Sequence, residues 1–128
     1  MQIRNTVALV TGANRGIGAA LVRTLLDEGA SKVYAAARHV TDLNALAAAG
    51  DSRIVPVRLD VTDDDQVERI ASEAGDVRIL FNNAGVLDFG SVLDAPAAAF
   101  IKNFGVNFFG LLHTTRAFAP ALTEGDYQ

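Results

Sequence analysis

The amino-acid sequence predicts an α/β fold in which helices cover both faces of a parallel β-sheet. Short apolar runs alternate with longer stretches whose apolar residues have helical spacing, and this alternation is typical of successive βαβ units. A glycine-rich segment, residues 11–18 (TGANRGIG), joins the first apolar run to the first helical stretch. A strand, a glycine-rich turn and a helix in this order indicate a Rossmann-like three-layer sandwich.

The length and composition suit one domain, residues 1–128, with a hydrophobic core, because 50% of the residues are hydrophobic. The net charge of −4 argues against nucleic acid or an anionic membrane as a partner, and no apolar run approaches membrane-spanning length. The absence of cysteine excludes disulfides and thiolate metal sites. The first expected strand begins too early to leave room for a signal peptide, so we expect a cytoplasmic protein.

The first two strands are expected at residues 6–11 and 32–37, and the first two helices at residues 16–28 and 41–49. On the inner face of the first helix we expect Ile17, Ala20, Leu21, Thr24 and Leu25. On the inner face of the second helix we expect Leu43, Leu46 and Ala47.

The third strand, residues 53–59, contains Pro56. Because proline cannot donate to a strand ladder, it is tolerated only on an edge strand or at a bulge. The strand order 3-2-1-4 places this strand outermost and therefore fits the sequence.

A third helix is expected to follow Thr62, which can cap it. Three aspartates, residues 63–65, then lie near the positive end of the helix dipole. A metal cluster is the alternative interpretation of this acidic run, but capping explains every member, and we predict no metal site. The inner face of this helix is expected to carry Val67, Ile70, Ala71 and Ala74.

The fourth strand is expected at residues 77–81 and a long helix at 97–119, followed by a flexible tail at 123–128. The long helix carries two apolar stripes, and only one of them can cover the sheet. The first stripe contains Ile101, Phe104, Phe108, Leu111 and Thr115, and the second contains Val106, Phe109 and Ala117. The fourth strand also leaves an apolar edge. We therefore expect a homo-oligomer that forms through the last helix or the edge of the fourth strand.

Three motifs follow strand ends in order: residues 11–18, then Asp60-Val61, then residues 82–85 (NNAG). With them the chain resembles the short-chain dehydrogenase/reductase family of the classical type. The resemblance covers essentially the whole chain but only the N-terminal half or so of that family's domain, so the expected fold is truncated relative to the family's.

The resemblance implies a cofactor site at these motifs. The implied cofactor-binding residues are Gly12, Asn14, Arg15, Gly16, Ile17, Gly18, Asp60, Val61, Asn82, Ala84 and Gly85. Asp60 would accept a hydrogen bond from the adenine amino group, and Val61 would lie against the ring. Asn107 stands where the family places a helix asparagine of its proton relay, which makes it the catalytic candidate.

Each of these residues also has a purely structural interpretation. Asp60 can cap the helix that follows, residues 82–85 can form a plain turn, and residues 105–107 can form a helix kink. The coincidence of all three motifs favours binding for Asp60 and leaves Asn107 open.

The end of the second strand points to the preferred cofactor. A fold that selects NAD(H) usually has an acidic residue here, which binds the ribose 2′-hydroxyl, whereas this chain has Arg38 after three alanines. Arg15 can reach the same phosphate from the neighbouring turn. A hydrogen bond to a charged group contributes about 1.5–3 kcal/mol, so we predict NADP(H) as the preferred cofactor.

The family's catalytic serine and Tyr-x-x-x-Lys pair have no counterpart in this chain. Tyr34 is followed by Arg38 at the same offset, but it lies on the second strand and is interpreted as an ordinary sheet residue. His39 and His113 are interpreted as surface or packing residues. Three functions therefore stay open: an oxidoreductase that acts on a small carbonyl or alcohol substrate, a non-catalytic dinucleotide-binding module, and an interaction protein.

Overall fold

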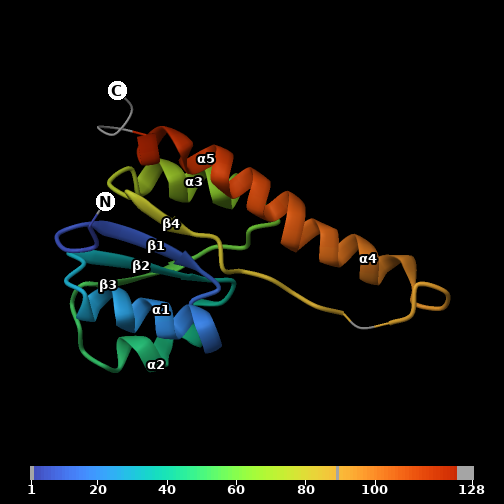
Figure 1. Ribbon diagram of the computed structural model, residues 1–128, viewed down its shortest axis with the longest axis horizontal. Helices are drawn as coiled ribbons and strands as arrows, with labels where there is room; N and C mark the ends of the chain where they lie inside the picture. Colours follow the sequence, from blue (N-terminus) through green and yellow to red (C-terminus); the bar gives the residue numbers. More distant parts are fainter. Residues whose placement is uncertain (1, 89, 124–128) are drawn as a thin grey trace.

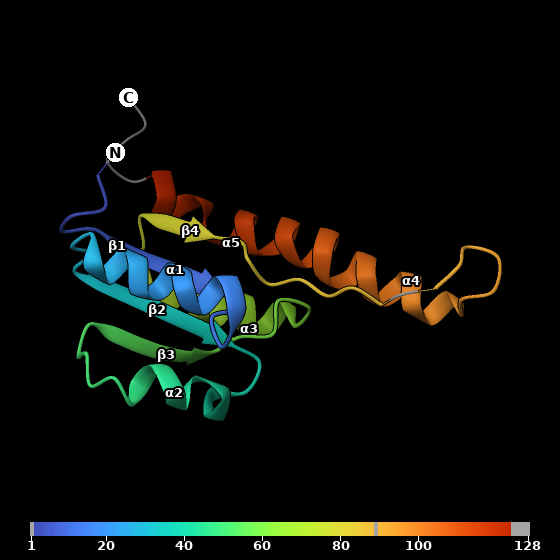
Figure 2. The same ribbon diagram turned by 60° about the horizontal axis from the view of Figure 1, so that its bottom comes forward.

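The computed structural model describes residues 2–88 and 90–123 and contains a parallel four-stranded sheet between two layers of helices (Figures 1 and 2). The strands are β1 (Val7–Thr11), β2 (Lys32–Ala37), β3 (Ile54–Arg58) and β4 (Ile79–Phe81). They lie in the order β3-β2-β1-β4. The predicted fold class and strand order are confirmed, and Pro56 lies exposed on the edge strand β3.

Both faces of the central strands are covered, so β1 and β2 are largely apolar, with Lys32 and Tyr34 of β2 only half-buried. Ala8 and Val10 of β1 belong to one core cluster, and Leu9 belongs to the other. The same alternation occurs in β2, where Ala35 and Ala36 face opposite clusters. This pattern is typical of a parallel sheet with helices on both sides.

Helices from different parts of the chain form the two outer layers (Figures 1 and 2). One layer contains α1 (Gly16–Asp27), the 3₁₀ turn η1 (Val40–Leu43) and α2 (Asn44–Ala47). The other layer contains α3 (Asp64–Glu73) and α5 (Leu111–Thr123). The expected single helix at residues 41–49 is therefore shorter and begins with a 3₁₀ turn.

The inner face of α1 was predicted only in part, because Leu25 is buried and Leu21 packs against the core, but Ala20 and Thr24 are exposed. Its buried residues are Gly18, Ala19, Val22, Leu25 and Leu26, whereas Ile17 is 74% exposed. A Cβ on Gly18 would lie only 2.1 Å from the carbonyl oxygen of Gly12. This close approach turns the small residues Gly18 and Ala19 toward the sheet, and the larger apolar residue at position 17 faces away. A similar error concerns Ala47 of α2, which is exposed.

The cap of α3 is Asp63, not Thr62. The Asp63 side chain accepts a hydrogen bond from the backbone N–H of Gln66 at 3.1 Å. Thr62 instead donates its backbone N–H and its hydroxyl to Oδ1 of Asp60 at 2.9 and 2.6 Å. Asp60 therefore holds Thr62 in the turn that precedes the helix, and the helix begins one residue later than expected. The inner face of α3 is confirmed, with Val67, Ile70 and Ala74 buried.

The last helical stretch is continuous but not uniform. It consists of α4 (Ala97–Phe104), a π-helical turn η2 (Gly105–Gly110) and α5. The wider turn is the form in which an extra residue is commonly accommodated within a helix, and it lies where the sequence allowed a kink. The helix runs on to Thr123 with Pro120 inside it, beyond the expected end at residue 119. Thr123 of the expected tail is thus helical, and residues 124–128 lie outside the described part of the chain.

As expected, only one of the two apolar stripes of this helix packs against the core, and Phe109 is the exception within that stripe. Phe118 is fully buried, and Val106 and Ala117 pack against the same cluster as Leu9. Phe109 was expected beside Val106 but is 60% exposed, because the π-turn changes the spacing of side chains around the helix. The large apolar residues exposed on this stretch are Ile101, Phe104, Phe108, Phe109 and Leu111. None of the described helices is long and apolar enough to cross a membrane.

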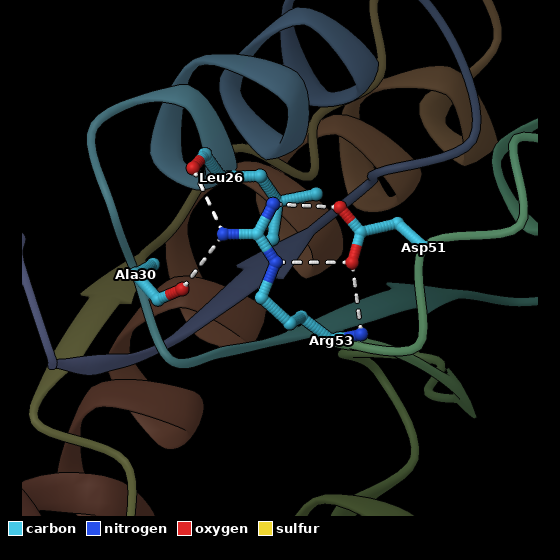
Figure 3. Close-up of polar contacts among 4 residues, drawn as sticks. All are labelled: Leu26, Ala30, Asp51 and Arg53. Atoms are coloured by element: carbon cyan, nitrogen blue, oxygen red, sulfur yellow. Dashed lines mark hydrogen bonds and ion pairs between the residues drawn. The ribbon is translucent and has the colours of Figure 1, made fainter.

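Arg53, just before β3, connects three parts of the fold (Figure 3). Its guanidinium donates to both carboxylate oxygens of Asp51, at 3.0 and 2.7 Å. The same group donates to the carbonyl oxygens of Leu26 and Ala30, at 3.1 and 3.4 Å. Leu26 lies in the last turn of α1, whose carbonyls have no partner within the helix. Arg53 thus adds a second donor to the carbonyl oxygen of Leu26, which also accepts from the backbone N–H of Gly29 at 3.0 Å. Its hydrogen bonds to the Asp51 carboxylate hold the pKa of Asp51 at about 2.

Candidate functional site

A cleft of about 660 Å³ opens at the carboxyl ends of the strands. Its lining comes from the glycine-rich turn after β1, from the ends of β2, β3 and β4, and from α4 with η2. Of the residues predicted to bind the cofactor, those in the lining are Gly12, Asn14, Arg15, Gly16, Ile17, Arg38, Asp60, Val61, Ala84 and Gly85. In parallel α/β sheets, ligands bind in this position.

Three predicted site residues lie elsewhere. Gly18 is buried beneath the turn, where it permits the close contact with Gly12. Asn82 donates its side-chain N–H to the hydroxyl of Thr115 at 3.0 Å and does not line the cleft. Asn107 contacts the segment after β4 and lines a separate shallow groove of about 190 Å³.

The glycine-rich turn has the geometry that an anionic ligand needs. Gly12 and Gly16 have φ angles of +63° and +55°, a conformation that side chains disfavour. A Cβ on Gly16 would meet no atom within 4 Å, although Gly16 lines the cleft. The backbone is therefore exposed to a ligand at the start of α1, where N–H groups and the helix dipole favour phosphate.

The turn is fastened to the end of β4 by two side chains that the sequence analysis missed. The Thr11 hydroxyl accepts hydrogen bonds from the backbone N–H groups of Asn83 and Ala84, at 3.0 and 2.9 Å. Asn83 Nδ2 donates to the carbonyl oxygen of Gly12 at 3.2 Å. These bonds fix the position of the glycine-rich turn at Gly12 relative to the segment after β4 at Ala84, and both residues line the cleft.

Asp60 has a structural role and a free acceptor. Its Oδ1 holds Thr62, and its backbone N–H donates to the side chain of Gln66 at 2.8 Å. The capping interpretation of Asp60 is therefore wrong, because Asp63 caps α3. One oxygen of Asp60 instead holds the turn before the helix, and no described residue donates a hydrogen bond to the other, Oδ2.

Charged residues of both signs line the cleft. Arg15 and Arg38 are exposed and form no ion pair with a described residue, whereas Lys102 is 3.4 Å from the Asp88 carboxylate. Asp42 joins Asp60 as a second acidic residue of the lining. An anion that binds in the cleft can therefore pair with either arginine without first breaking an ion pair to a described carboxylate.

One wall of the cleft was not predicted at all. It is formed by α4 and η2, and its lining residues are Ile101, Lys102, Gly105 and Val106. Only tertiary structure shows that this helix reaches the glycine-rich turn, because about ninety residues of chain separate them. Other lining residues missed from the sequence are Ala37, Asp42, Leu59, Thr62, Asn83 and Val86.

Tyr34 lies outside the cleft, as expected for a sheet residue. Its hydroxyl donates to Asp76 Oδ1 at 2.8 Å, and the Lys32 ammonium lies 4.8 Å from its ring centroid while pairing with Asp76. Burial raises the pKa of Tyr34. The hydrogen bond to Asp76 raises the pKa of Lys32. These residues form a structural polar cluster.

The fold and the position of the cleft define a Rossmann-like α/β protein. A sequence model of the short chain dehydrogenase family matches residues 6–127, and the chain belongs to that family. It is 34% identical to an uncharacterized oxidoreductase of Methylorubrum extorquens, over 97% of this chain and 53% of that protein. It is 38% identical to the short chain dehydrogenase pigC of Monascus ruber, over 91% of this chain and 43% of that protein.

Two solved structures are similar in fold and sequence. A short chain dehydrogenase from Burkholderia cenocepacia in complex with NADP has a TM-score of 0.89 and 46% identity, over 95% of this chain and 50% of that one. A short chain dehydrogenase/reductase from Burkholderia phymatum in complex with NAD has a TM-score of 0.84 and 34% identity, over 95% and 46%. The chain thus spans about half the length of these relatives.

Proposed function

We propose that residues 1–128 form a dinucleotide-binding domain that binds NADP(H) in preference to NAD(H) in the cleft. The observation that carries this proposal is the convergence, in one cleft, of an open glycine-rich turn and two arginines that form no ion pair with a described residue. Both the NADP and the NAD complexes are found among similar structures, so the preference rests on this chain's own arginines.

The residues present fit such a ligand. The N–H groups around Gly16 would hold the pyrophosphate, and the free Oδ2 of Asp60 would accept from the adenine amino group beside Val61. Arg38 and Arg15 would bind the ribose 2′-phosphate. With about 1.5–3 kcal/mol from a charged hydrogen bond, even one arginine favours NADP(H) by about ten- to a hundredfold.

We further propose that the protein is an oxidoreductase acting on a carbonyl or alcohol. The bound dinucleotide would supply or accept the hydride. The described residues would bind it, orient it between the glycine-rich turn and the wall formed by α4 and η2, and exclude water from that side. Its substrate is a small molecule.

A non-catalytic dinucleotide-binding module is the second candidate, and the hydrogen bonding of the Asn107 side chain favours it. Both side-chain polar atoms of Asn107 are bonded to the backbone of Val86. Among the described residues that line the cleft, Thr62 is the one with a hydroxyl group, and this hydroxyl donates to Asp60. Neither residue offers a free group for proton transfer.

Fluorescence titration with NADPH and NADH tests the binding proposal. We expect saturable binding of NADPH that is at least tenfold tighter than that of NADH. No detectable affinity for NADPH at millimolar concentration would refute it. Oxidation of NADPH with a panel of small ketones and aldehydes separates the two candidates, because the module binds without turnover.

We also propose a homo-oligomer, formed through the last helix or the β4 edge. The exposed apolar residues on α4 and η2, among them Phe104 and Phe108, support it. A monomer in gel filtration at high protein concentration would contradict it. The cytoplasmic location stays a prediction.

A further inference from the structure

In the wall formed by α4 and η2, only η2 is packed into the core, through Val106 and the buried Gly110. No residue of α4 is buried, and α4 extends past the end of the sheet (Figure 1). Ile101 and Lys102 nevertheless line the same cleft as the glycine-rich turn. Core packing of η2 and α5 anchors one end of this continuous helix, and contacts outside the core fix the position of α4 itself.

Two asparagines one helical turn apart bind the segment that follows β4. Asn107 Oδ1 accepts from the N–H of Val86 at 2.9 Å, and its Nδ2 donates to the carbonyl of Val86 at 2.7 Å. Asn103 repeats this pattern two residues further along, with the N–H and carbonyl of Asp88 at 3.1 and 3.3 Å. Each side-chain amide thus accepts from the N–H and donates to the carbonyl of a single residue, as the backbone of a neighbouring β-strand does.

The spacing explains why both pairs can form. Four residues of helix rise about 6 Å, and two residues of extended chain rise about 6.6 Å, so positions 103 and 107 match positions 88 and 86. Figure 1 shows the segment after β4 running beside α4. Val86 also lines the cleft, so the asparagines join two of its walls.

We propose that Asn103 is a positioning residue for the cofactor cleft, which sets the place of α4 through the backbone of Asp88. This inference rests on the proposed binding function. Asn103 does not line the cleft itself, so it acts through Ile101 and Lys102 on the same helix. The ion pair between Lys102 and Asp88, at 3.4 Å, joins the same two segments but is exposed and contributes less.

The test compares Asn103→Ala with Phe104→Ala. Alanine favours helix more than asparagine does, so Asn103→Ala leaves α4 helical and removes only the two bonds to Asp88. Phe104 is the matched control, because it is exposed on the same helix and does not line the cleft. NADPH affinity, melting temperature and amide hydrogen exchange of Asp88 are measured for both variants and the unaltered protein.

We expect Asn103→Ala to weaken NADPH binding by about five- to tenfold, the equivalent of one or two net hydrogen bonds. The Asp88 amide should exchange faster in this variant, and saturating NADPH should slow it again, because the ligand binds the ordered wall. Phe104→Ala should bind NADPH like the unaltered protein.

Normal NADPH affinity in Asn103→Ala, whether or not its melting temperature falls, would overturn the inference, because the bonds would then serve stability alone. That result leaves the proposed function intact. If the unaltered protein and Phe104→Ala also bind no NADPH, the proposed function fails, and the positioning role fails with it.

Discussion

The hydroxyl oxygen of Thr11 lies 2.9 Å from the backbone nitrogen of Ala84 and accepts its hydrogen bond. Thr11 ends β1 and Ala84 follows β4, so one side chain closes the junction between neighbouring strands where the cleft begins. The same hydroxyl lies 3.3 Å from the carbonyl oxygen of Phe81, to which it donates. Since Thr11 is only 2% exposed, water cannot replace these bonds.

Thr11→Val should therefore destabilise the fold. Valine keeps the branched shape but leaves the N–H of Ala84 without its acceptor, which costs about 1–3 kcal/mol. The free energy of unfolding in urea measures the effect. Thr114→Val is the matched control, because Thr114 is fully buried and its hydroxyl has no hydrogen-bond partner among the described residues. The control should be neutral or stabilising, and equal losses in the two variants would contradict the assigned role of Thr11.

Gly18→Ala should be destabilising for a steric reason. The added methyl group would lie 2.1 Å from the carbonyl oxygen of Gly12, so α1 must move away from the turn. Overpacking of this kind costs about 1–3 kcal/mol. Gly75→Ala is the control, because a Cβ there meets no atom within 4 Å. Thermal melts of the two variants give the comparison, and an unchanged melting temperature for Gly18→Ala would show that α1 adjusts freely.

The sequence predicted features that depend on local chemistry and short spacing. The β-type runs, the glycine-rich turn and Pro56 on the edge strand were sufficient for the fold class and the strand order. The end of the second strand pointed to Arg38, whereas Asp60 and Ala84 were assigned to the same site from the resemblance to the short-chain dehydrogenase/reductase family.

The features that the sequence did not predict depend on how a helix is rotated about its own axis or on contacts between segments far apart in the sequence. The buried side of α1 was assigned only in part, with Leu25 correct and Ile17 wrong, because residues 17–26 contain two adjacent apolar stripes. Only the contact of Gly18 with Gly12 selects between these stripes. Asn82 and Asn83 are neighbours with identical side chains, yet one bonds Thr115 and the other bonds Gly12.

His113 shows the same limit. In sequence it has no neighbouring carboxylate, whereas in the structure its Nε2 lies 3.4 Å from Glu68 and 3.8 Å from Asp64 on α3. Its interpretation as a packing residue holds, since its side chain is about one-third exposed at the contact between two helices. Only the tertiary structure, which packs α3 against α5, brings these carboxylates close to His113.

The pair of Asp51 and Arg53 predicts a pH dependence of stability. The neighbouring guanidinium lowers the pKa of Asp51 from 3.8 to about 2, so folding favours the ionised carboxylate. This contribution is complete above about pH 4 and is lost as the pH falls toward about 2. Asp51→Asn should lower stability at neutral pH and flatten its decline over that range. Urea unfolding at several pH values measures both effects.

Asp94→Asn serves as the control for this comparison, because Asp94 is exposed and forms no ion pair with a described residue. It should keep the acid dependence of the unaltered protein. If Asp51→Asn keeps the same dependence, the contacts in Figure 3 do not contribute to stability in solution.

Arg38→Asp should shift the cofactor preference toward NAD(H). An aspartate there repels the 2′-phosphate and can accept from a ribose 2′-hydroxyl, so the ratio of NADPH to NADH affinity should fall by about ten- to a hundredfold. Arg23→Asp is the matched charge reversal, because Arg23 is exposed on α1 and does not line the cleft. Titrations of all three proteins with both cofactors decide the matter, and an unchanged ratio in Arg38→Asp would remove the argument for NADP(H).

A comparison of Gly16→Ala with Gly50→Ala separates backbone strain from ligand contact. Both glycines have positive φ angles, +55° and +72°, and a Cβ at either would meet no atom within 4 Å. Each substitution therefore carries the same left-handed strain, about 1–2 kcal/mol, and should lower the melting temperature equally. Only Gly16 lines the cleft, so only its methyl group occupies space that a pyrophosphate needs.

Gly16→Ala should accordingly bind NADPH at least tenfold more weakly than Gly50→Ala at matched stability, as measured by fluorescence titration. A methyl group placed between a phosphate and the N–H groups at the start of α1 lengthens every hydrogen bond in that contact, and hydrogen bonds weaken steeply with distance. Equal affinities in the two variants would mean that the ligand does not approach the turn. The open space at Gly16 would then be ordinary surface, and the phosphate would have to bind elsewhere in the cleft.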